Sequence, residues 1–234
     1  MRNVEREDIP KSLRENAEIW AAELLEAIEK SKKDNSKVQD TLYDRYKKND
    51  VKTALVKMYG DGTFTYCCYC ESTINNVSFE HIEHRMPKKK SKDKYPEKTY
   101  DWDNLNLACE LCNGSKKNQY DEKYPILDPT GNEPIIRHLG YKLSPSKGVY
   151  RETLTRHGIT TVKHADLDRE SLRMSRLKVW NETIKAISEI KRLGEDSRAY
   201  TASKMLWDLC AGEYGSLIQY LLNQWSIEDV RTQR

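Results

Sequence analysis

Two Cys-x-x-Cys pairs form the strongest chemical pattern in this chain: Cys67 with Cys70, and Cys109 with Cys112. Each such segment turns tightly and presents two thiolates on one side, so two of them supply the four sulfurs of a closed tetrahedral zinc site. A closed site performs no reaction, but zinc binding contributes roughly 10–16 kcal/mol of apparent folding free energy to a small domain. The spacing therefore predicts a structural zinc site.

The two remaining cysteines are not expected to bind this zinc. Cys68 could replace Cys67 as a ligand, but the Cys68-x-Cys70 spacing forms a poorer turn, so we predict that Cys67 is paired with Cys70. Cys210 lies far from both pairs in the sequence and is expected in the core.

Disulfide bonds and an isolated zinc ribbon are the alternative interpretations of the cysteines. Residues 1–7 lack the apolar core of a signal peptide, and no stretch approaches the roughly 20 apolar residues of a membrane span. We therefore expect a cytoplasmic protein with no membrane segment, whose reduced thiols bind zinc. The segment between the two pairs is longer than in the usual zinc ribbon, so its content decides the function.

Residues that could catalyse a reaction lie between the two pairs. Residues 78–84 are expected to form a strand that ends at Glu83 and His84, just before Pro87. A lone histidine is more often structural than catalytic, but His84 is accompanied by an acidic neighbour, by asparagines and by a cysteine pair. Imidazole has an unperturbed pKa of about 6.5, which suits a general base.

These residues resemble the HNH endonuclease family, whose ββα-metal finger binds one catalytic metal ion. That family carries an Asp/Glu-His-x-x-Pro element, a central Asn-Leu, and a Cys-x-x-Cys-His/Asn-x-x-Lys element. The matching segments occur here in the same order: Glu83 to Pro87, Asn104-Leu105, and Cys109 to Lys116.

The resemblance implies a role for each position. His84 would be the general base that takes a proton from the water attacking a phosphodiester. Glu83 and Asn113 would bind the catalytic metal, and their oxygen ligands favour Mg²⁺ or Mn²⁺ over a soft ion. Asn104 would orient His84 through its side-chain oxygen or reach the metal. Asn113 stands where many relatives have histidine.

A second acidic-histidine pair, Glu80-His81, lies three residues before Glu83-His84. The family's proline follows the base by three residues, and Pro87 fits this spacing from His84. We therefore predict that His84 is the base and that His81 has a supporting or structural role.

Lysines surround the proposed centre, although the net charge is only +3. A lysine run is most often a solvated loop, but beside a phosphodiesterase motif it indicates contact with the nucleic-acid backbone. The interleaved Tyr95, Tyr100 and Trp102 could stack on an unpaired base or pack the loop onto the finger. The predicted nucleic-acid-binding residues are Lys88, Lys89, Lys90, Lys92, Lys116 and Lys117.

The expected fold class is α+β and mainly α-helical, with a central ββα-metal finger flanked by helices. Periodic apolar residues predict an N-terminal helix after Pro10, a second helix over residues 51–59, and two or three helices after residue 166. Short strands are expected around Tyr141, Val149 and Thr161. The predicted parts are a helical region 1–60, the nuclease finger 61–125, strands and loops 126–165, and a helical region 166–234.

The wider pattern resembles the Septu/retron-associated antiphage family of PtuB-like HNH nuclease subunits. The resemblance rests on Tyr69-Cys70-Glu71, on Pro87-Lys88 after the His84 element, on residues 100–105 and on Leu127-Asp128-Pro129. It implies an ATPase partner subunit (PtuA-like) and, in some systems, a retron reverse transcriptase with its DNA. The chain has no Gly-rich phosphate loop, which fits an ATPase on a separate chain.

The substrate and two other functions stay open. A single-metal finger of the family it resembles would hydrolyse the phosphodiesters of DNA or RNA, so phage DNA and host RNA such as a tRNA are both candidates. One alternative is a zinc-stabilised nucleic-acid-binding or adaptor module without catalysis, which Asn113 in place of histidine favours. The other alternative is a restriction-type HNH nuclease that acts without a partner.

Overall fold

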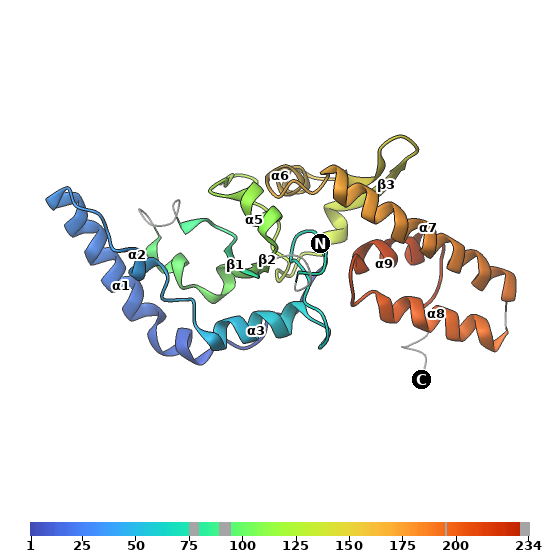
Figure 1. The fold of residues 1–234 in the computed structure, drawn as a ribbon, viewed down its shortest axis with the longest axis horizontal. Coiled ribbons are helices and arrows are strands. Elements are labelled where there is room, and N and C mark those ends of the chain that lie inside the picture. The colour runs from blue at the N-terminus through green and yellow to red at the C-terminus, as the bar shows by residue number, and fades with distance from the viewer. Residues whose placement is uncertain (75–79, 89–94, 195, 230–234) are drawn as a thin grey trace.

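A computed structural model of the chain describes residues 1–74, 80–88, 95–194 and 196–229. The molecule is elongated, with the N-terminal helices at one end, the C-terminal helices at the other end and the two cysteine pairs between them (Figure 1). The α+β fold class is confirmed, because helices dominate and the strands form two small antiparallel sheets.

The N-terminal region consists of α1 (Lys11–Asp34), α2 (Asp40–Tyr43) and α3 (Asn49–Tyr59). Pro10 precedes the first turn of α1, where its missing N–H costs no hydrogen bond. One face of each long helix is buried, as the apolar spacing predicted; the buried residues include Leu13, Leu24 and Ile28 of α1 and Val51 and Leu55 of α3.

The central finger begins with a turn from Gly60 and contains the first sheet. Strand β1 (His81–His84) pairs antiparallel with β2 (Leu105–Ala108), with His84 opposite Leu105. Two 3-10 turns, η1 (Pro96–Thr99) and η2 (Trp102–Asn104), lead into β2, and α5 (Glu110–Lys116) follows it. The predicted strand started at residue 78, and its first residues lie outside the described part of the chain.

A hairpin follows the finger, built from β3 (Leu139–Ser144) and β4 (Gly148–Thr153). The turn η3 (Ile135–Arg137) precedes it, and α6 (Arg156–His164) follows it. The strand expected around Thr161 is wrong, because Thr161 lies inside α6. Thr155 caps that helix by accepting from the Gly158 amide, which overrides the β-branched composition of the segment.

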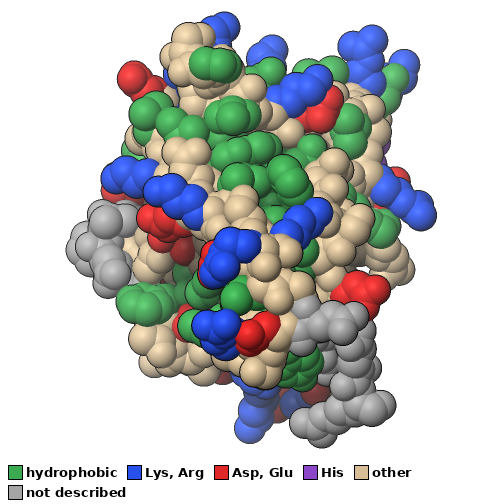
Figure 2. Space-filling view, turned by 90° about the vertical axis from the view of Figure 1, so that its right-hand side faces the viewer, with side chains coloured by type: hydrophobic (Ala, Val, Ile, Leu, Met, Phe, Trp, Pro, Cys, Tyr) green, Lys and Arg blue, Asp and Glu red, His purple; other side chains and the backbone are tan. Residues whose placement is uncertain are grey.

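Three helices close the described chain: α7 (Glu170–Leu193), α8 (Ser197–Leu209) and α9 (Gly215–Gln224). Their shared core includes Leu172, Ile187, Trp207, Leu217 and Leu221. Figure 2 faces this end of the molecule and shows apolar side chains gathered between Lys and Arg side chains. Among the described residues, no helix combines the length and apolar composition that crossing a membrane requires.

Residues 1–9 lead from the middle of the molecule, where Figure 1 marks the N-terminus, to the start of α1. The Val4 amide donates to the Pro129 carbonyl at 2.7 Å, and Arg2 Nη1 donates to the Gly212 carbonyl at 2.8 Å. Arg6 Nη1 donates to the Leu105 carbonyl at 2.7 Å. This segment therefore ties β2 of the finger to the later elements.

Candidate functional site

Four cysteine thiols meet in the interior between the first turn of the finger and α5. The Sγ atoms of Cys67, Cys70, Cys109 and Cys112 lie within 4.8 Å of one another, and all four residues are buried. Cys70 Sγ and Cys109 Sγ are 3.8 Å apart. Zn–S bonds of about 2.3 Å in a tetrahedron place the sulfurs about 3.8 Å apart, so the cluster fits zinc in both chemistry and size.

The surroundings of the cluster also suit a tetrathiolate site. Arg169 Nη1 lies 3.5 Å from Cys112 Sγ, which places a cation beside a centre that carries excess negative charge. Burial raises the pKa of the Cys67 thiol, so this thiol needs a nearby cation to ionise. The neighbouring Cys68 is outside the cluster, and its amide donates to the Leu107 carbonyl at 2.9 Å.

Glu83 is buried at the centre of a small network of side chains. Tyr69, which stands between the cysteines of the first pair, donates its hydroxyl to Glu83 Oε2 at 2.7 Å. Lys116 Nζ from α5 is 2.5 Å from Glu83 Oε1 and also donates to the His84 carbonyl at 2.7 Å. The carboxylate is thus held by one residue from each cysteine segment.

His84, at the end of β1, is oriented by the main chain. Its Nε2 is 2.9 Å from the carbonyl oxygen of Thr99. Since a carbonyl only accepts, this contact requires a proton on Nε2 and leaves Nδ1 as the unprotonated nitrogen. Burial lowers the pKa of His84 to about 3, so the imidazole is neutral at physiological pH.

Tyr46 from the N-terminal region packs against His84. The two rings meet edge to face with centroids 4.6 Å apart, and Tyr46 is buried. The histidine ring is therefore packed against the Tyr46 ring and held at Nε2 by the Thr99 carbonyl.

Asn104 is buried and binds the loops on both sides of His84. Its Oδ1 accepts from the Met86 amide at 2.7 Å, and its Nδ2 donates to the carbonyls of Met86 at 3.0 Å and Lys98 at 2.8 Å. The amide oxygen is thus engaged by the Met86 backbone. Asn104 fixes the backbone after His84 and the turn that carries the Thr99 carbonyl.

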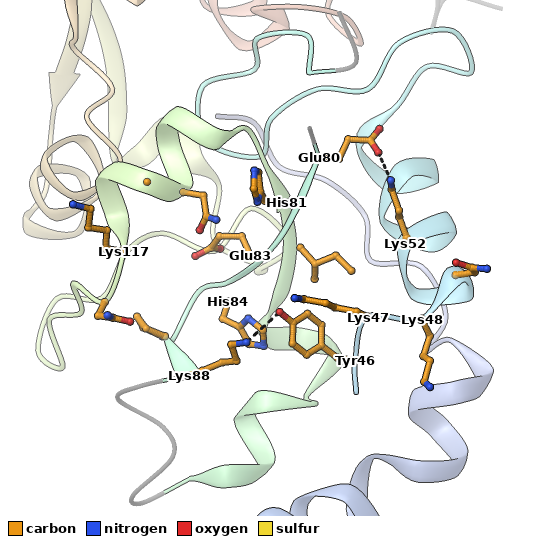
Figure 3. A pocket seen from close by; sticks show the side chains of 16 residues that line it. Tyr46, Lys47, Lys48, Lys52, Glu80, His81, Glu83, His84, Lys88 and Lys117 are labelled. Atoms are coloured by element: carbon orange, nitrogen blue, oxygen red, sulfur yellow. Dashed lines mark hydrogen bonds and ion pairs between the residues drawn. The ribbon is translucent and has the colours of Figure 1, made fainter. Parts of the chain in front are cut away.

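A cleft of about 770 Å³ opens above these residues (Figure 3). Glu83, His84 and Asn113 all line it, so three of the four predicted catalytic and metal-binding residues share one cavity. Asn113 follows Cys112 directly on α5, and successive residues of a helix point in different directions. Cys112 therefore joins the thiol cluster, whereas Asn113 lines the cleft. His81 lines the same cleft and is half-buried.

The oxygen atoms of two residues in the cleft are chemically suited to bind a hard divalent cation. Glu83 and Asn113 offer carboxylate and amide oxygens, the ligands that Mg²⁺ and Mn²⁺ prefer. Lys116 is the local competitor, because its ammonium group holds one oxygen of Glu83.

The predicted nucleic-acid-binding lysines are not equivalent. Lys117 is exposed and lines the cleft. Lys88 also lines it, with its Nζ 3.1 Å from Asp44 Oδ1. Lys116, by contrast, is only 1% exposed, because it packs under β1 to neutralise Glu83, so the expectation that it contacts nucleic acid needs correction. Lys89, Lys90 and Lys92 lie outside the described residues.

The aromatic residues near the lysine run also differ in their exposure to solvent. Trp102 is buried and donates its Nε1–H to the Glu7 carbonyl at 2.8 Å. Tyr100 is also buried, and its hydroxyl donates to the Leu42 carbonyl. Both therefore pack the finger onto the N-terminal region, whereas Tyr95 is 48% exposed.

Three participants were missed by sequence reasoning: Tyr46, Tyr69 and the Thr99 carbonyl. Tyr69 had a usable signal, because it lies inside the first cysteine pair and close to any residue that the pair supports. Tyr46 precedes the finger by many residues, and a carbonyl oxygen has no side-chain signature, so neither could be found from spacing.

Comparison with known proteins matches residues 67–119 to the HNH endonuclease family. The chain is 30% identical over 150 residues to Septu protein PtuB of Bacillus thuringiensis, covering 62% of this chain and 52% of that protein. It is 38% identical over 93 residues to Septu protein PtuB of Bacillus mycoides (strain KBAB4), covering 36% of this chain and 29% of that protein. No solved structure is significantly similar.

The matched region corresponds to about half of the first relative and less of the second. The HNH match includes both cysteine pairs together with Glu83, His84, Asn104 and Asn113. Residues 67–119 therefore form a domain similar to HNH endonucleases, within a chain that is similar to Septu PtuB proteins.

Proposed function

We propose that the chain is a metal-dependent endonuclease that hydrolyses phosphodiester bonds of nucleic acid. One observation carries the proposal: a neutral His84 lines the cleft with Nε2 bound to the Thr99 carbonyl, beside the oxygen ligands of Glu83 and Asn113. This arrangement leaves one imidazole nitrogen able to accept a proton from water at a site where a cation can bind.

Each residue has a distinct part in this reaction. His84 Nδ1 takes the proton from the attacking water, and the Thr99 carbonyl stabilises the imidazolium that forms by accepting from Nε2–H. Glu83 and Asn113 would hold Mg²⁺ or Mn²⁺, which stabilises negative charge on the phosphate and the leaving oxygen. Asn104 keeps the His84 backbone in place.

The biological role that we propose is the nuclease effector of a bacterial antiphage system with an ATPase partner. The similarity to Septu PtuB proteins supports this role. Exposed apolar residues on α8, Tyr200, Met205 and Leu209, are consistent with a protein partner at the C-terminal helices. The retron components suggested by the resemblance find no support in the comparisons.

The substrate is proposed by class only: phage DNA or a host RNA such as a tRNA. Hydrolysis by a general base and one metal acts on the phosphate group, which both polymers share. The residues that line the described cleft offer charge and amide groups, which contact a backbone without reading its sequence.

Replacement of His84 with alanine tests the assignment. Cleavage of plasmid DNA and of tRNA is measured with Mg²⁺ or Mn²⁺, for the chain alone and in the presence of a PtuA-like ATPase. We expect at least a 100-fold loss for His84→Ala, in line with the usual contribution of a general base. His81→Ala is the matched control, because it lines the same cleft and should lose much less.

Three outcomes would each contradict one part of this proposal. Full cleavage by a folded, zinc-loaded His84→Ala variant would exclude His84 as the base. Tight nucleic-acid binding without cleavage by the wild type, under every metal and partner condition, would favour the zinc-stabilised adaptor. Strong cleavage by the chain alone would favour a nuclease that needs no partner.

A further inference from the structure

We propose that residues 46–52, which lead into α3 and lie outside the HNH match, form the second wall of the nucleic-acid cleft and grip the phosphodiester backbone. This inference rests on the proposed function, because it assigns a ligand to the same cleft. Tyr46, Lys47, Lys48, Asn49 and Lys52 line one side of the cavity, and Asn113, Gly114 and Lys117 line another.

The positions of the side chains support this arrangement. In Figure 3, Lys52 and Lys117 lie on opposite sides of the cleft, with His81 and Glu83 between them. Lys47, Lys48, Lys52 and Lys117 are all exposed. A strand lying in the cleft would therefore meet lysines on both walls while its phosphate sits over the catalytic residues.

The acidic residues near this wall leave the cleft positive. Asp50 faces α1, where its carboxylate accepts from the amide and hydroxyl of Ser12, each at 2.8 Å. Asp44 is shared by Lys47 at 2.9 Å and Lys88 at 3.1 Å, so one negative charge meets two positive ones. Lys52 is paired with Glu80 at 2.8 Å.

Two lysines in the cleft have no acidic partner within the described ranges. Lys48 Nζ lies 5.6 Å from the centre of the Trp20 ring, a contact that orients the ammonium group without neutralising it. Lys117 follows α5 directly. Both ammonium groups are therefore available to a phosphate.

The same segment is coupled to the catalytic base. Tyr46 begins the wall and packs edge to face on His84 at 4.6 Å. A phosphate held by the lysines next to Tyr46 would thus be fixed relative to the His84 ring. The wall has a positioning role as well as a binding role.

The ligand class is the phosphodiester backbone of DNA or RNA. Lysine contacts to phosphate release condensed counterions, so binding should weaken with salt and depend little on base sequence. Three fluorescent probes distinguish the sources of the backbone: single-stranded DNA, duplex DNA of the same sequence, and single-stranded RNA.

The test compares Lys47→Ala/Lys48→Ala with the wild type by fluorescence anisotropy, in EDTA-free buffer without Mg²⁺ or Mn²⁺ so that the probes stay intact. At about 100 mM salt we expect the Kd of the variant to be at least 10-fold larger, because counterion release at each phosphate contact contributes strongly to the binding free energy. The slope of log Kd against log salt should fall by about 1.4 for single strands or about 1.8 for duplex.

A matched control removes the same charge elsewhere. Lys178 and Lys185 are exposed on α7, away from the cleft, so Lys178→Ala/Lys185→Ala should bind within about twofold of the wild type. Glu80→Gln should change the Kd in the opposite direction from Lys47→Ala/Lys48→Ala. It releases Lys52 and removes a charge that repels phosphate, so the Kd should become several-fold tighter.

The outcomes separate this inference from the proposed function. A wild type that binds but never cleaves would contradict the nuclease proposal and leave the wall intact. Equal Kd values and salt slopes for Lys47→Ala/Lys48→Ala and the α7 control, with zinc content and unfolding midpoint unchanged, would overturn the wall. Failure of the wild type to bind any of the three probes would overturn it as well.

Discussion

Lys116 Nζ lies 2.5 Å from Glu83 Oε1, and each of the two residues is only 1% exposed. The pair joins α5, which follows the second cysteine pair, to the end of β1. Tyr69 of the first cysteine pair donates to the other oxygen of the same carboxylate. Both cysteine segments of the thiol cluster are thereby connected to the proposed catalytic centre through Glu83.

Lys116→Met should destabilise the protein by about 3–5 kcal/mol, because it leaves a buried carboxylate without its cation. The double variant Glu83→Gln/Lys116→Met should recover a large part of this loss, since it removes both charges. Urea unfolding of zinc-loaded protein measures the difference. A single variant within about 1 kcal/mol of the wild type would contradict the buried ion pair.

The same lysine competes with the catalytic metal for Glu83. We expect Mn²⁺ to raise the unfolding midpoint of Lys116→Met more than that of the wild type, because the cation restores the missing positive charge. Differential scanning calorimetry across Mn²⁺ concentrations checks this, with Lys117→Met as the control. An equal shift in all three proteins would contradict competition at Glu83.

Loss of zinc should unfold the finger instead of only inactivating it. Cys112→Ser removes one of the four ligands and should abolish the apparent stabilisation of roughly 10 kcal/mol that a structural zinc supplies. Cys210→Ser removes a cysteine outside the cluster and should keep both metal content and fold. Zinc stoichiometry and near-UV circular dichroism are the measurements, and a folded Cys112→Ser protein without zinc would refute the structural role.

Asn104→Ala should lower kcat by about 10- to 100-fold with a smaller change in KM, because displacement of a catalytic group by about 1 Å can have an effect of this size. The variant loses three hydrogen bonds that hold the loops around His84. Asn181→Ala on the exposed face of α7 is the control. A change confined to KM would indicate that Asn104 contacts the substrate.

Stability should depend on pH through His84. Burial lowers its folded pKa to about 3 from the usual 6.5, so between these values the unfolded state binds the extra proton. The contribution of His84 to stability is therefore complete above about pH 6.5 and falls as the pH decreases, by at most about 1.4 kcal/mol per pH unit. The difference in unfolding free energy between wild type and His84→Leu, from pH 5 to 8, isolates this term from acid release of zinc. A difference independent of pH would contradict a neutral, buried imidazole.

Local patterns in the sequence were sufficient for much of the fold. The spacing of Cys67, Cys70, Cys109 and Cys112 predicted the thiol cluster, because a Cys-x-x-Cys turn needs only neighbouring residues to form. Apolar periodicity located α1, α3 and the C-terminal helices for the same reason. The segment around Thr161 failed because a helix cap at Thr155 outweighed β-branched composition.

The sequence alone determined which residues could bind zinc and which could catalyse hydrolysis, since these follow from residue type and order along the chain. Only the tertiary structure decided their surroundings: that Lys116 is buried against Glu83, that the Thr99 carbonyl orients His84, and that Tyr46 packs on its ring. These contacts join segments that are far apart in sequence, or use backbone atoms that every residue has. Their energies arise from burial and close approach, which are set only when the chain is folded.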